Sequence, residues 1–118
     1  MVERRNLQRR SFSYYMRVVD DASGQLVGHL ADISPRGFKL DCSQTLPVNK
    51  DFRLRMDLTS DVADRPYITF TARSKWSSPD SMDPFVFNTG FEIVHISMSD
   101  GEIFQRIVEK YGSPENRW

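Results

Sequence analysis

The sequence predicts an all-β domain with a terminal helix: a small β-barrel of about six antiparallel strands, with one C-terminal α-helix packed over an opening or a side. Short segments with an apolar residue at every second position recur up to residue 96, and turn residues separate them. After Ser97 the apolar period becomes that of an amphipathic helix. With 118 residues and 39% hydrophobic content, the chain can bury one compact core and is too short for two.

The first three strands are predicted in the amino-terminal third of the chain. A strand at 11–19 has apolar or aromatic side chains at every second position, and turn residues at 20–24 connect it to an extended segment at 25–33. These two strands should form a hairpin. After a turn at 34–37, Phe38 begins a third short strand in which apolar and polar residues alternate.

The next two strands have the clearest patterns. At 51–58 apolar residues face one way and charged residues face the other, which is typical of a strand with one solvated face. The segment at 67–76 follows a polar loop. Its alternation predicts that Trp76 lies in one register with Ile68 and Phe70.

The last strand is predicted at 85–96. It follows a loop or hairpin tip at 77–84, a stretch that contains two prolines and three serines. The residues at 88–90 interrupt the apolar pattern with Asn, Thr and Gly, and this predicts a bend or a bulge in the strand.

A single helix is predicted after Ser97. Ser99 and Glu102 have the spacing of a capping box at its start. Gly112 and then Pro114 are predicted to end it. One helical face is apolar and consists of Ile103, Phe104, Ile107, Val108 and Tyr111.

The positive charge is concentrated in an arm at the N-terminus. The chain has 16 basic and 16 acidic residues, yet residues 1–17 carry a net charge of +4, so the remainder carries −4. The charged residues of this segment are Arg4, Arg5, Arg9, Arg10, Arg17 and Glu3. We therefore divide the chain into a flexible arginine-rich arm at 1–10, a barrel domain with its helix at 11–112, and a tail at 113–118.

Two short motifs carry the strongest functional signal. Arg5 and Arg9 have R-x-x-x-R spacing, and Asp32, Ser34 and Gly37 have D-x-S-x-x-G spacing. In this order, within a small β-rich chain that ends in a helix, they resemble the ligand-binding signature of PilZ domains, which are receptors for the bacterial second messenger cyclic di-GMP. The resemblance covers nearly the whole chain. It implies that the two arginines grip the ligand from the arm while the other three residues cup it from the barrel surface.

The chemistry of cyclic di-GMP suits these arginines. The ligand is a dianion with two guanine rings, and a guanidinium can bind a phosphate in a fork, bind guanine O6 and N7, or stack on the purine. Arg4, Arg10 and Arg36 are candidates for auxiliary contacts. Because the like charges of the arm repel one another, we expect it to be mobile alone and to wrap around bound ligand. The ordered arm would then change the surface offered to a downstream protein partner.

The residues of the turn are predicted to select guanine. The Watson–Crick edge of guanine carries N1–H and N2–H₂ donors, and the carboxylate of Asp32 is a double acceptor for that edge. Ser34, two residues further on, would point to the same side of an extended backbone and add a hydroxyl contact. Gly37 lacks a Cβ, so the chain can turn tightly there and the ligand can approach the main chain. Asp32 should therefore reject adenine.

Two other functions are alternatives. One is a PilZ-like adaptor that binds only proteins, although such relatives often lack one or both motifs. The other is a barrel that binds single-stranded nucleic acid, with bases stacked on Tyr14, Tyr15 or Phe38. The charge of −4 beyond residue 17 disfavours the second, since a basic stripe across the barrel would be expected.

The sequence does not predict an enzyme. His29 and Cys42 lie on predicted strands without a third group to orient them, and His95 is the only other histidine. No G-x-x-x-x-G-K-[ST] or H-E-x-x-H pattern occurs, so we expect no metal and no cofactor. The single cysteine, and the lack of an apolar leader or of an apolar stretch of ~20 residues, predict a cytoplasmic protein that does not bind membranes.

Overall fold

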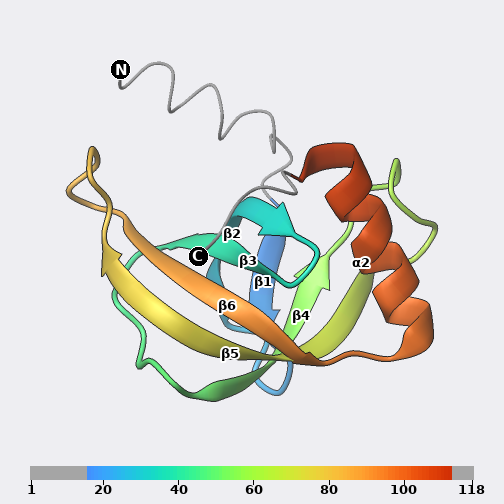
Figure 1. Ribbon diagram of the computed structural model, residues 1–118, viewed down its shortest axis with the longest axis horizontal. Coiled ribbons are helices and arrows are strands. Elements are labelled where there is room, and N and C mark those ends of the chain that lie inside the picture. The colour runs from blue at the N-terminus through green and yellow to red at the C-terminus, as the bar shows by residue number, and fades with distance from the viewer. Residues whose placement is uncertain (1–15, 113–118) are drawn as a thin grey trace.

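Six strands of the described part close into an antiparallel barrel, as the sequence predicts (Figure 1). The computed structural model describes residues 16–112, so the predicted arm, most of the first predicted strand and the predicted tail lie outside the described residues. The elements are β1 (Arg17–Asp20), β2 (Leu26–Ser34), β3 (Gly37–Cys42), β4 (Asp51–Asp57), β5 (Tyr67–Pro79), β6 (Phe87–His95) and α2 (Met98–Tyr111). Around the barrel the order is β1-β2-β3-β6-β5-β4, and the pairing of β1 with β4 closes the ring.

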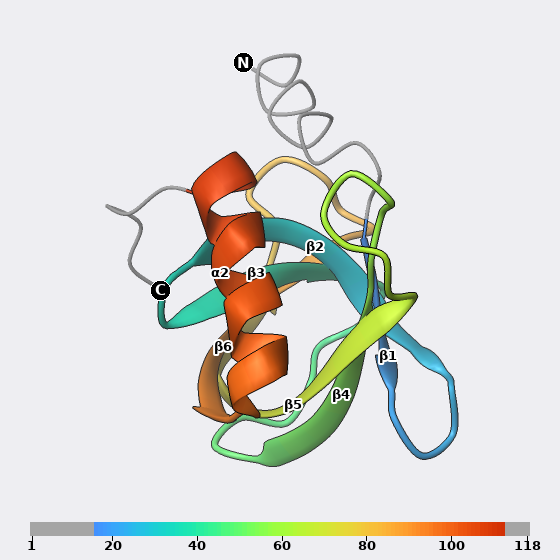
Figure 2. The same cartoon turned by 90° about the vertical axis from the view of Figure 1, so that its right-hand side faces the viewer.

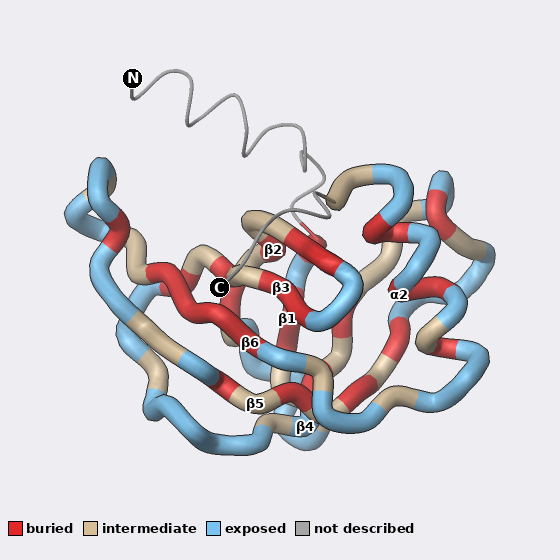
Figure 3. Tube along the Cα trace, viewed as in Figure 1, coloured by how far each residue is buried: buried red, intermediate tan, exposed pale blue. Residues whose placement is uncertain are grey.

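Buried positions recur along the strands of the barrel (Figure 3). The inward-facing apolar residues of the strands form its core. Phe38 on β3 is fully buried, and its ring centroid lies 5.1 Å from that of Phe91 and 5.4 Å from that of Phe70. Aromatic pairs at such separations contribute about 0.5–1.5 kcal/mol beyond the burial of their surface. Phe38 is therefore a core residue, and the prediction that it could stack on a nucleic-acid base is wrong.

The longest strand departs from the predicted pattern. β5 continues to Pro79, so the loop predicted at 77–84 begins later than expected. Lys75 is an extra residue in the β5–β6 ladder, and it forms a bulge just before Trp76. The bulge predicted at 88–90 is wrong, because these residues of β6 pair in regular register with both β3 and β5. The glycine at this point accommodates a neighbouring side chain instead of bending the strand.

The start of α2 differs from the prediction by two residues. Ser97, and not Ser99, is the N-cap, because its hydroxyl accepts a hydrogen bond from the N–H of Asp100 at 3.2 Å. The helix is fixed in this position by Asp100, whose Oδ2 accepts a bond of 3.2 Å from the N–H of Thr69 on β5. At the other end Gly112 is the C-cap, as predicted, and its N–H binds a carbonyl of the last helical turn.

α2 lies across the barrel (Figure 2). Its apolar face is buried against the strands. The buried apolar residues of this face are Ile103, Phe104, Ile107 and Val108. The helix contacts both β2 and β5, which are not neighbours in the ring. A helix that contacts both bridges one opening of the barrel, which is one of the two predicted positions. In residues 16–112, no helix is long and apolar enough to span a membrane.

Candidate functional site

The D-x-S-x-x-G residues lie at the end of the β2–β3 hairpin. Ser34 is the last residue of β2 and pairs directly with Gly37, the first residue of β3. Pro35 and Arg36 form the exposed turn between them. Asp32 lies two residues before the turn on the same strand, so the structure brings the three predicted barrel residues together.

A bulge in β2 decides where the side chain of Asp32 points. Leu30 is buried in the core, so strict alternation along the strand would also turn Asp32 inward. Ala31 is an extra residue at this point, and Asp32 pairs with Lys39 of β3 after it. The extra residue reverses the alternation, so that Ile33 enters the core and Asp32 lies on the outer face.

The backbone holds the carboxylate of Asp32 in one orientation. Its Oδ1 accepts a hydrogen bond of 2.9 Å from the N–H of Ile33, and the residue is half-buried. Ser34 follows an inward-facing residue, so its side chain lies on the same side of the strand as Asp32, as predicted. Only 7% of Ser34 is exposed, because it sits against the first residue of β3.

Gly37 is required by the packing of two backbones. Among the described residues, the glycine with a positive φ is Gly24, so the conformation of Gly37 is open to other residue types. A Cβ on Gly37 would nevertheless collide with the carbonyl oxygen of Phe91 on β6. The close approach continues into the turn, where the N–H of Ile93 binds the carbonyl of Arg36 at 2.9 Å. The sequence predicts a glycine here because of a tight turn. In the structure, Gly37 is required because β3 and β6 approach each other closely at this residue.

A row of outward-facing residues crosses four strands beside the turn. Asp32 on β2 pairs with Lys39 on β3, and Lys39 pairs with Gly90 on β6. Gly90 pairs in turn with Trp76 on β5. Because adjacent strands lie about 4.8 Å apart, the row is about 14 Å long. It presents a carboxylate, an ammonium group and an indole, and the indole lies over the glycine.

The bulge at Lys75 places Trp76 on this outer face. The sequence predicts Trp76 in one register with the inward residues of β5, and that prediction is wrong because the extra residue reverses the alternation. A Cβ on Gly90 would collide with the indole Nε1 and lie 2.5 Å from Cε2, so the indole covers the space above this glycine. Sequence reasoning did not place Lys39 and Trp76 in this row beside the turn. The outward direction of Lys39 could have been predicted, because it lies between the core residues Phe38 and Leu40.

The described part of the chain begins beside this site. Its predicted ligand contacts, Arg4, Arg5, Arg9 and Arg10, lie outside the described residues. Met16, the first described residue, accepts through its carbonyl a hydrogen bond of 2.9 Å from the N–H of Leu30, two residues before Asp32. The end of α2 reaches the same strand, since a Cβ on Gly112 would lie 2.8 Å from the carbonyl oxygen of Ile33. The first described residue, the turn and the end of the helix therefore all lie along β2.

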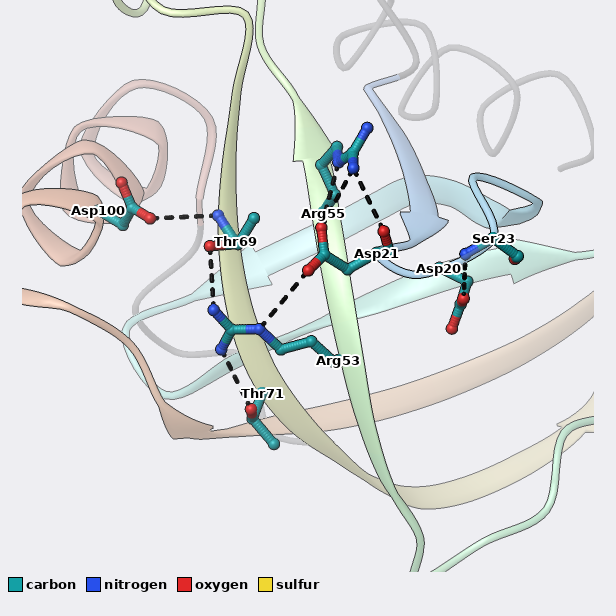
Figure 4. Close-up of polar contacts among 8 residues, drawn as sticks. All are labelled: Asp20, Asp21, Ser23, Arg53, Arg55, Thr69, Thr71 and Asp100. Carbon is teal, nitrogen blue, oxygen red and sulfur yellow. Dashed lines mark hydrogen bonds and ion pairs between the residues drawn. The ribbon is translucent and has the colours of Figure 1, made fainter.

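A second group of arginines, on β4, is engaged with neighbouring side chains (Figure 4). Arg55 donates two hydrogen bonds of 3.2 and 3.4 Å to Oδ1 of Asp21. Arg53 donates to the hydroxyls of Thr69 and Thr71 at 3.2 and 3.3 Å. These guanidiniums form the solvated face that the sequence predicts for 51–58, and we do not assign them to the ligand site.

Cys42 is a core residue. It is 5% exposed, in agreement with its prediction as a small apolar residue of a strand. Burial raises the pKa of its thiol to about 11, so the thiol stays protonated at neutral pH and is a poor nucleophile. In the part of the chain that the structure describes, no three His, Cys, Asp or Glu side chains are grouped to hold a metal ion.

Comparison with known families agrees with this geometry. A family model described as PilZ domain matches residues 3–110 of the chain. This chain belongs to the PilZ domain family. PilZ domains are generally receptors for cyclic di-GMP, and they are binding domains and adaptors, not enzymes.

Among solved structures, this PilZ domain is similar to the inhibitor of motility of Bacillus subtilis, MotI/DgrA. The TM-score is 0.62 and the sequence identity is 13%, so the likeness is one of fold. The alignment covers 80% of this chain and 45% of that protein, which is therefore much longer. No curated protein matches the sequence.

Proposed function

We propose that this PilZ domain is a receptor that binds cyclic di-GMP between the N-terminal R-x-x-x-R arm and the D-x-S-x-x-G turn. The observation that carries the proposal is the place where the arm begins. Met16 is hydrogen-bonded to Leu30, and this bond attaches the arm two residues from Asp32. An arm attached to the far side of the barrel would have no short path to the turn.

The arm is long enough to close over the row of outward-facing residues. Arg9 is seven residues and Arg5 eleven residues from Met16. An extended chain spans about 3.3–3.6 Å per residue, so Arg9 can reach about 23–25 Å and Arg5 about 36–40 Å from this attachment. The row from Asp32 to Trp76 is about 14 Å long. Both guanidiniums can therefore reach any part of a ligand that lies on it.

The row offers a complementary group for each part of the ligand. The Asp32 carboxylate accepts hydrogen bonds from N1–H and N2–H₂ of one guanine. The ammonium group of Lys39, one strand away, supplies a positive charge for a phosphate. The indole of Trp76 provides an aromatic surface for the second guanine, since stacking of a base on an aromatic side chain contributes about 1–3 kcal/mol. The arginines of the arm then bind the side of the ligand that faces away from the barrel.

Ligand binding changes the surface of the protein through the arm. Four arginines within residues 1–10 repel one another, and a dianion removes much of this repulsion when it binds. The bound arm covers part of the outer face of the barrel and presents a different surface to a downstream protein.

Calorimetric titration of the full chain tests the proposal. Cyclic di-GMP should give saturable binding, while cyclic di-AMP and the linear guanine dinucleotide should bind at least about tenfold more weakly, because Asp32 reads guanine and the row requires a folded ligand. Absence of binding to cyclic di-GMP would favour the alternative of an adaptor that binds only proteins. Tight binding of an oligonucleotide without any response to cyclic di-GMP would favour the nucleic-acid alternative.

A further inference from the structure

The loop between β5 and β6 is a fixed turn. Oδ2 of Asp80, a residue only 7% exposed, accepts hydrogen bonds from the N–H groups of Met82 and Asp83 at 3.0 and 2.9 Å. Oδ1 of Asp83 accepts a further bond of 2.9 Å from the N–H of Phe85. The N–H of Asp80 donates to the carbonyl of Val86 at 2.9 Å and closes the loop. The side chains that project from this loop are therefore held in defined positions.

Large apolar side chains are exposed on this turn and beside it. Phe85 is 82% exposed and Met82 is 39% exposed, and Leu26 at the start of β2 is 49% exposed. The loop projects at the left of Figure 1, at the opposite side of the molecule from α2. A fixed turn that holds an aromatic ring in water is unfavourable for the isolated protein, and such clusters mark surfaces for protein interaction. Phe and Met are also enriched in protein interfaces.

A groove of about 450 Å³ lies next to these side chains. Its walls come from the start of β2, the end of β3 and the β5–β6 loop, and its volume is in the usual range for binding pockets, about 300–1,000 Å³. The residues that matter for its chemistry are Leu26, His29, Asp41, Asp83 and Phe85. Two carboxylates line it, and no lysine or arginine of the described residues does. The lining therefore combines apolar side chains with two carboxylates.

The groove adjoins the proposed ligand face. Asp41 lies two residues from Lys39 on the same side of β3, and it pairs with His29 across the hairpin. Its Oδ1 accepts a hydrogen bond of 2.9 Å from the side-chain amide of Asn88, which fixes the carboxylate on the wall. His29 pairs with Arg17 at the root of the arm. A segment bound in the groove would consequently lie next to the place where the arm leaves the barrel.

We propose that this groove binds a segment of a partner protein in which a large apolar side chain is followed or preceded by a lysine or an arginine. The apolar side chain contacts Phe85 and Leu26, and the basic group pairs with the carboxylates of Asp41 and Asp83. Charge complementarity selects this occupant, because a basic group donates charge-assisted hydrogen bonds to the two carboxylates on the lining, whereas an acidic segment would meet like charge. The inference deepens the proposed function, since it names the surface and the chemistry of the downstream partner.

Selection from a random peptide library displayed on phage tests this groove. Immobilised full-length protein should enrich peptides in which a large apolar residue lies within two positions of a lysine or an arginine. The best peptide, made synthetically, is then titrated by calorimetry and by NMR of the isotope-labelled full chain. The amide shifts of the residues lining the groove should change first.

Three variants give the matched comparison. Phe85→Ser should weaken peptide binding by at least about tenfold, because it removes the apolar contact. Asp83→Asn should weaken it several-fold, since the amide oxygen keeps the bond to the N–H of Phe85 while the charge is lost. Met98→Ser is the control: Met98 is 83% exposed, slightly more than Phe85, but lies at the start of α2. Its affinity for the peptide should equal that of the wild type.

Four results would overturn the proposal. The first is enrichment of peptides that lack the apolar and basic pair, and the second is equal peptide affinity of Phe85→Ser and wild type. The third is a dimer of the protein that Phe85→Ser abolishes. The fourth is a change in the groove amide shifts when Arg5→Glu and Arg9→Glu are introduced without any peptide. The dimer would assign the groove to a second copy of the chain, and the last result would assign it to the arm. Cyclic di-GMP binding is measured on Phe85→Ser in parallel and should be unchanged. If the wild type does not bind cyclic di-GMP but still selects these peptides, only the proposed receptor function is wrong.

Discussion

At the scale of single residues, the carboxylate of Asp32 has one contact within the protein and one proposed contact with the ligand. Its Oδ1 accepts the N–H of Ile33 and so orients the side chain, while the carboxylate as a whole faces outward beside the turn. A substitution can therefore remove recognition without removing the local hydrogen bond. Asparagine retains an oxygen for Ile33 and loses the second acceptor, whereas alanine loses both.

Asp32→Asn and Asp32→Ala should each weaken cyclic di-GMP binding by about 1.5–3 kcal/mol, the cost of losing a charge-assisted hydrogen bond. They should also reduce the preference for guanine over adenine, because the double acceptor for N1–H and N2–H₂ is gone. Calorimetry with both cyclic dinucleotides measures this, and thermal unfolding shows that Asp32→Asn still folds. A variant that still rejects cyclic di-AMP would show that another residue reads the base.

Arg5→Ala and Arg9→Ala should each weaken cyclic di-GMP binding by about 1.5–3 kcal/mol, because each removes a charge-assisted contact to the ligand. Raising the salt concentration should reduce the effect of both. Arg106→Ala is the control, since this exposed arginine lies on α2 and donates to the carbonyl of Val62. Unchanged affinity in both arm variants would remove the arm from the mechanism.

The two motifs could be read from spacing alone, but the direction of their side chains could not. The alternation rule places Asp32 on the same face as Leu30, and only the extra Ala31 reverses it. The packing role of Gly37 could not be predicted, because contact between β3 and β6 depends on how distant segments pair. The roles of Asp32, Ser34 and Gly37 in ligand binding stay predictions. The same holds for the arginines, which are Arg4, Arg5, Arg9, Arg10 and Arg36.

At the scale of elements, two bulges of one residue each determine the composition of the outer face. Ala31 turns a carboxylate outward on β2, and Lys75 turns an indole outward on β5. The strands themselves were predictable from period-two patterns, and α2 from its apolar face and its terminal glycine. Bulges were not, because an extra residue is accommodated by the partner strand, and the partner is unknown until the sheet order is known. Lys75 has no feature that separates it from an ordinary outward-facing lysine.

The capping of α2 gives a direct test of where the helix begins. Ser97→Ala should reduce the free energy of unfolding by about 1 kcal/mol, because its hydroxyl accepts the N–H of Asp100. Ser99→Ala should change it by less than about 0.5 kcal/mol, since Ser99 is an exposed residue inside the first turn. Urea unfolding followed by circular dichroism compares the two variants. The opposite order of stabilities would restore the capping box predicted from Ser99 and Glu102.

At the scale of the whole molecule, exposed carboxylates link distant segments by hydrogen bonds. Asp61, in the loop between β4 and β5, accepts Nζ of Lys110 at 2.7 Å and the hydroxyl of Tyr111 at 2.8 Å, both at the end of α2. The bond from Lys110 is the main reason that the pKa of Asp61 lies well below its usual value. Arg73 lowers the pKa of Asp51 in the same way across β4 and β5. Both carboxylates therefore stabilise the fold in their ionised form.

The fold should consequently lose stability in acid. A carboxyl group whose pKa is lower in the folded state stabilises it above the unfolded pKa of about 3.9, and this contribution is lost as the pH falls below that value. The thermal midpoint should be nearly constant from about pH 7 to pH 5 and fall from about pH 4 downwards. Asp61→Asn should lower the midpoint at pH 7 and reduce its fall in acid, whereas Asp64→Asn, in the same loop, serves as the control. Equal acid sensitivity of Asp61→Asn and wild type would show that this carboxylate does not contribute.

The closed barrel was predictable as a whole because six strands with turn signals and one terminal helix allow few arrangements. The position of the groove was not, since it depends on a loop that the sequence marks only as polar and proline-rich. The sequence predicts Phe85 as the first residue of the last strand. In the structure β6 begins at Phe87, and Phe85 lies on the preceding turn.

The ring is completed by its shortest strand. β1 has four residues, pairs with β2 on one side and β4 on the other, and is the first element of the described residues. If bound ligand holds the N-terminal segment against the barrel, the resulting displacement acts first on β1. This strand closes the ring and has the fewest residues paired with its neighbours. Binding of ligand at the proposed site would then change the position of β4, which pairs with β1 and lies outside the proposed ligand contacts.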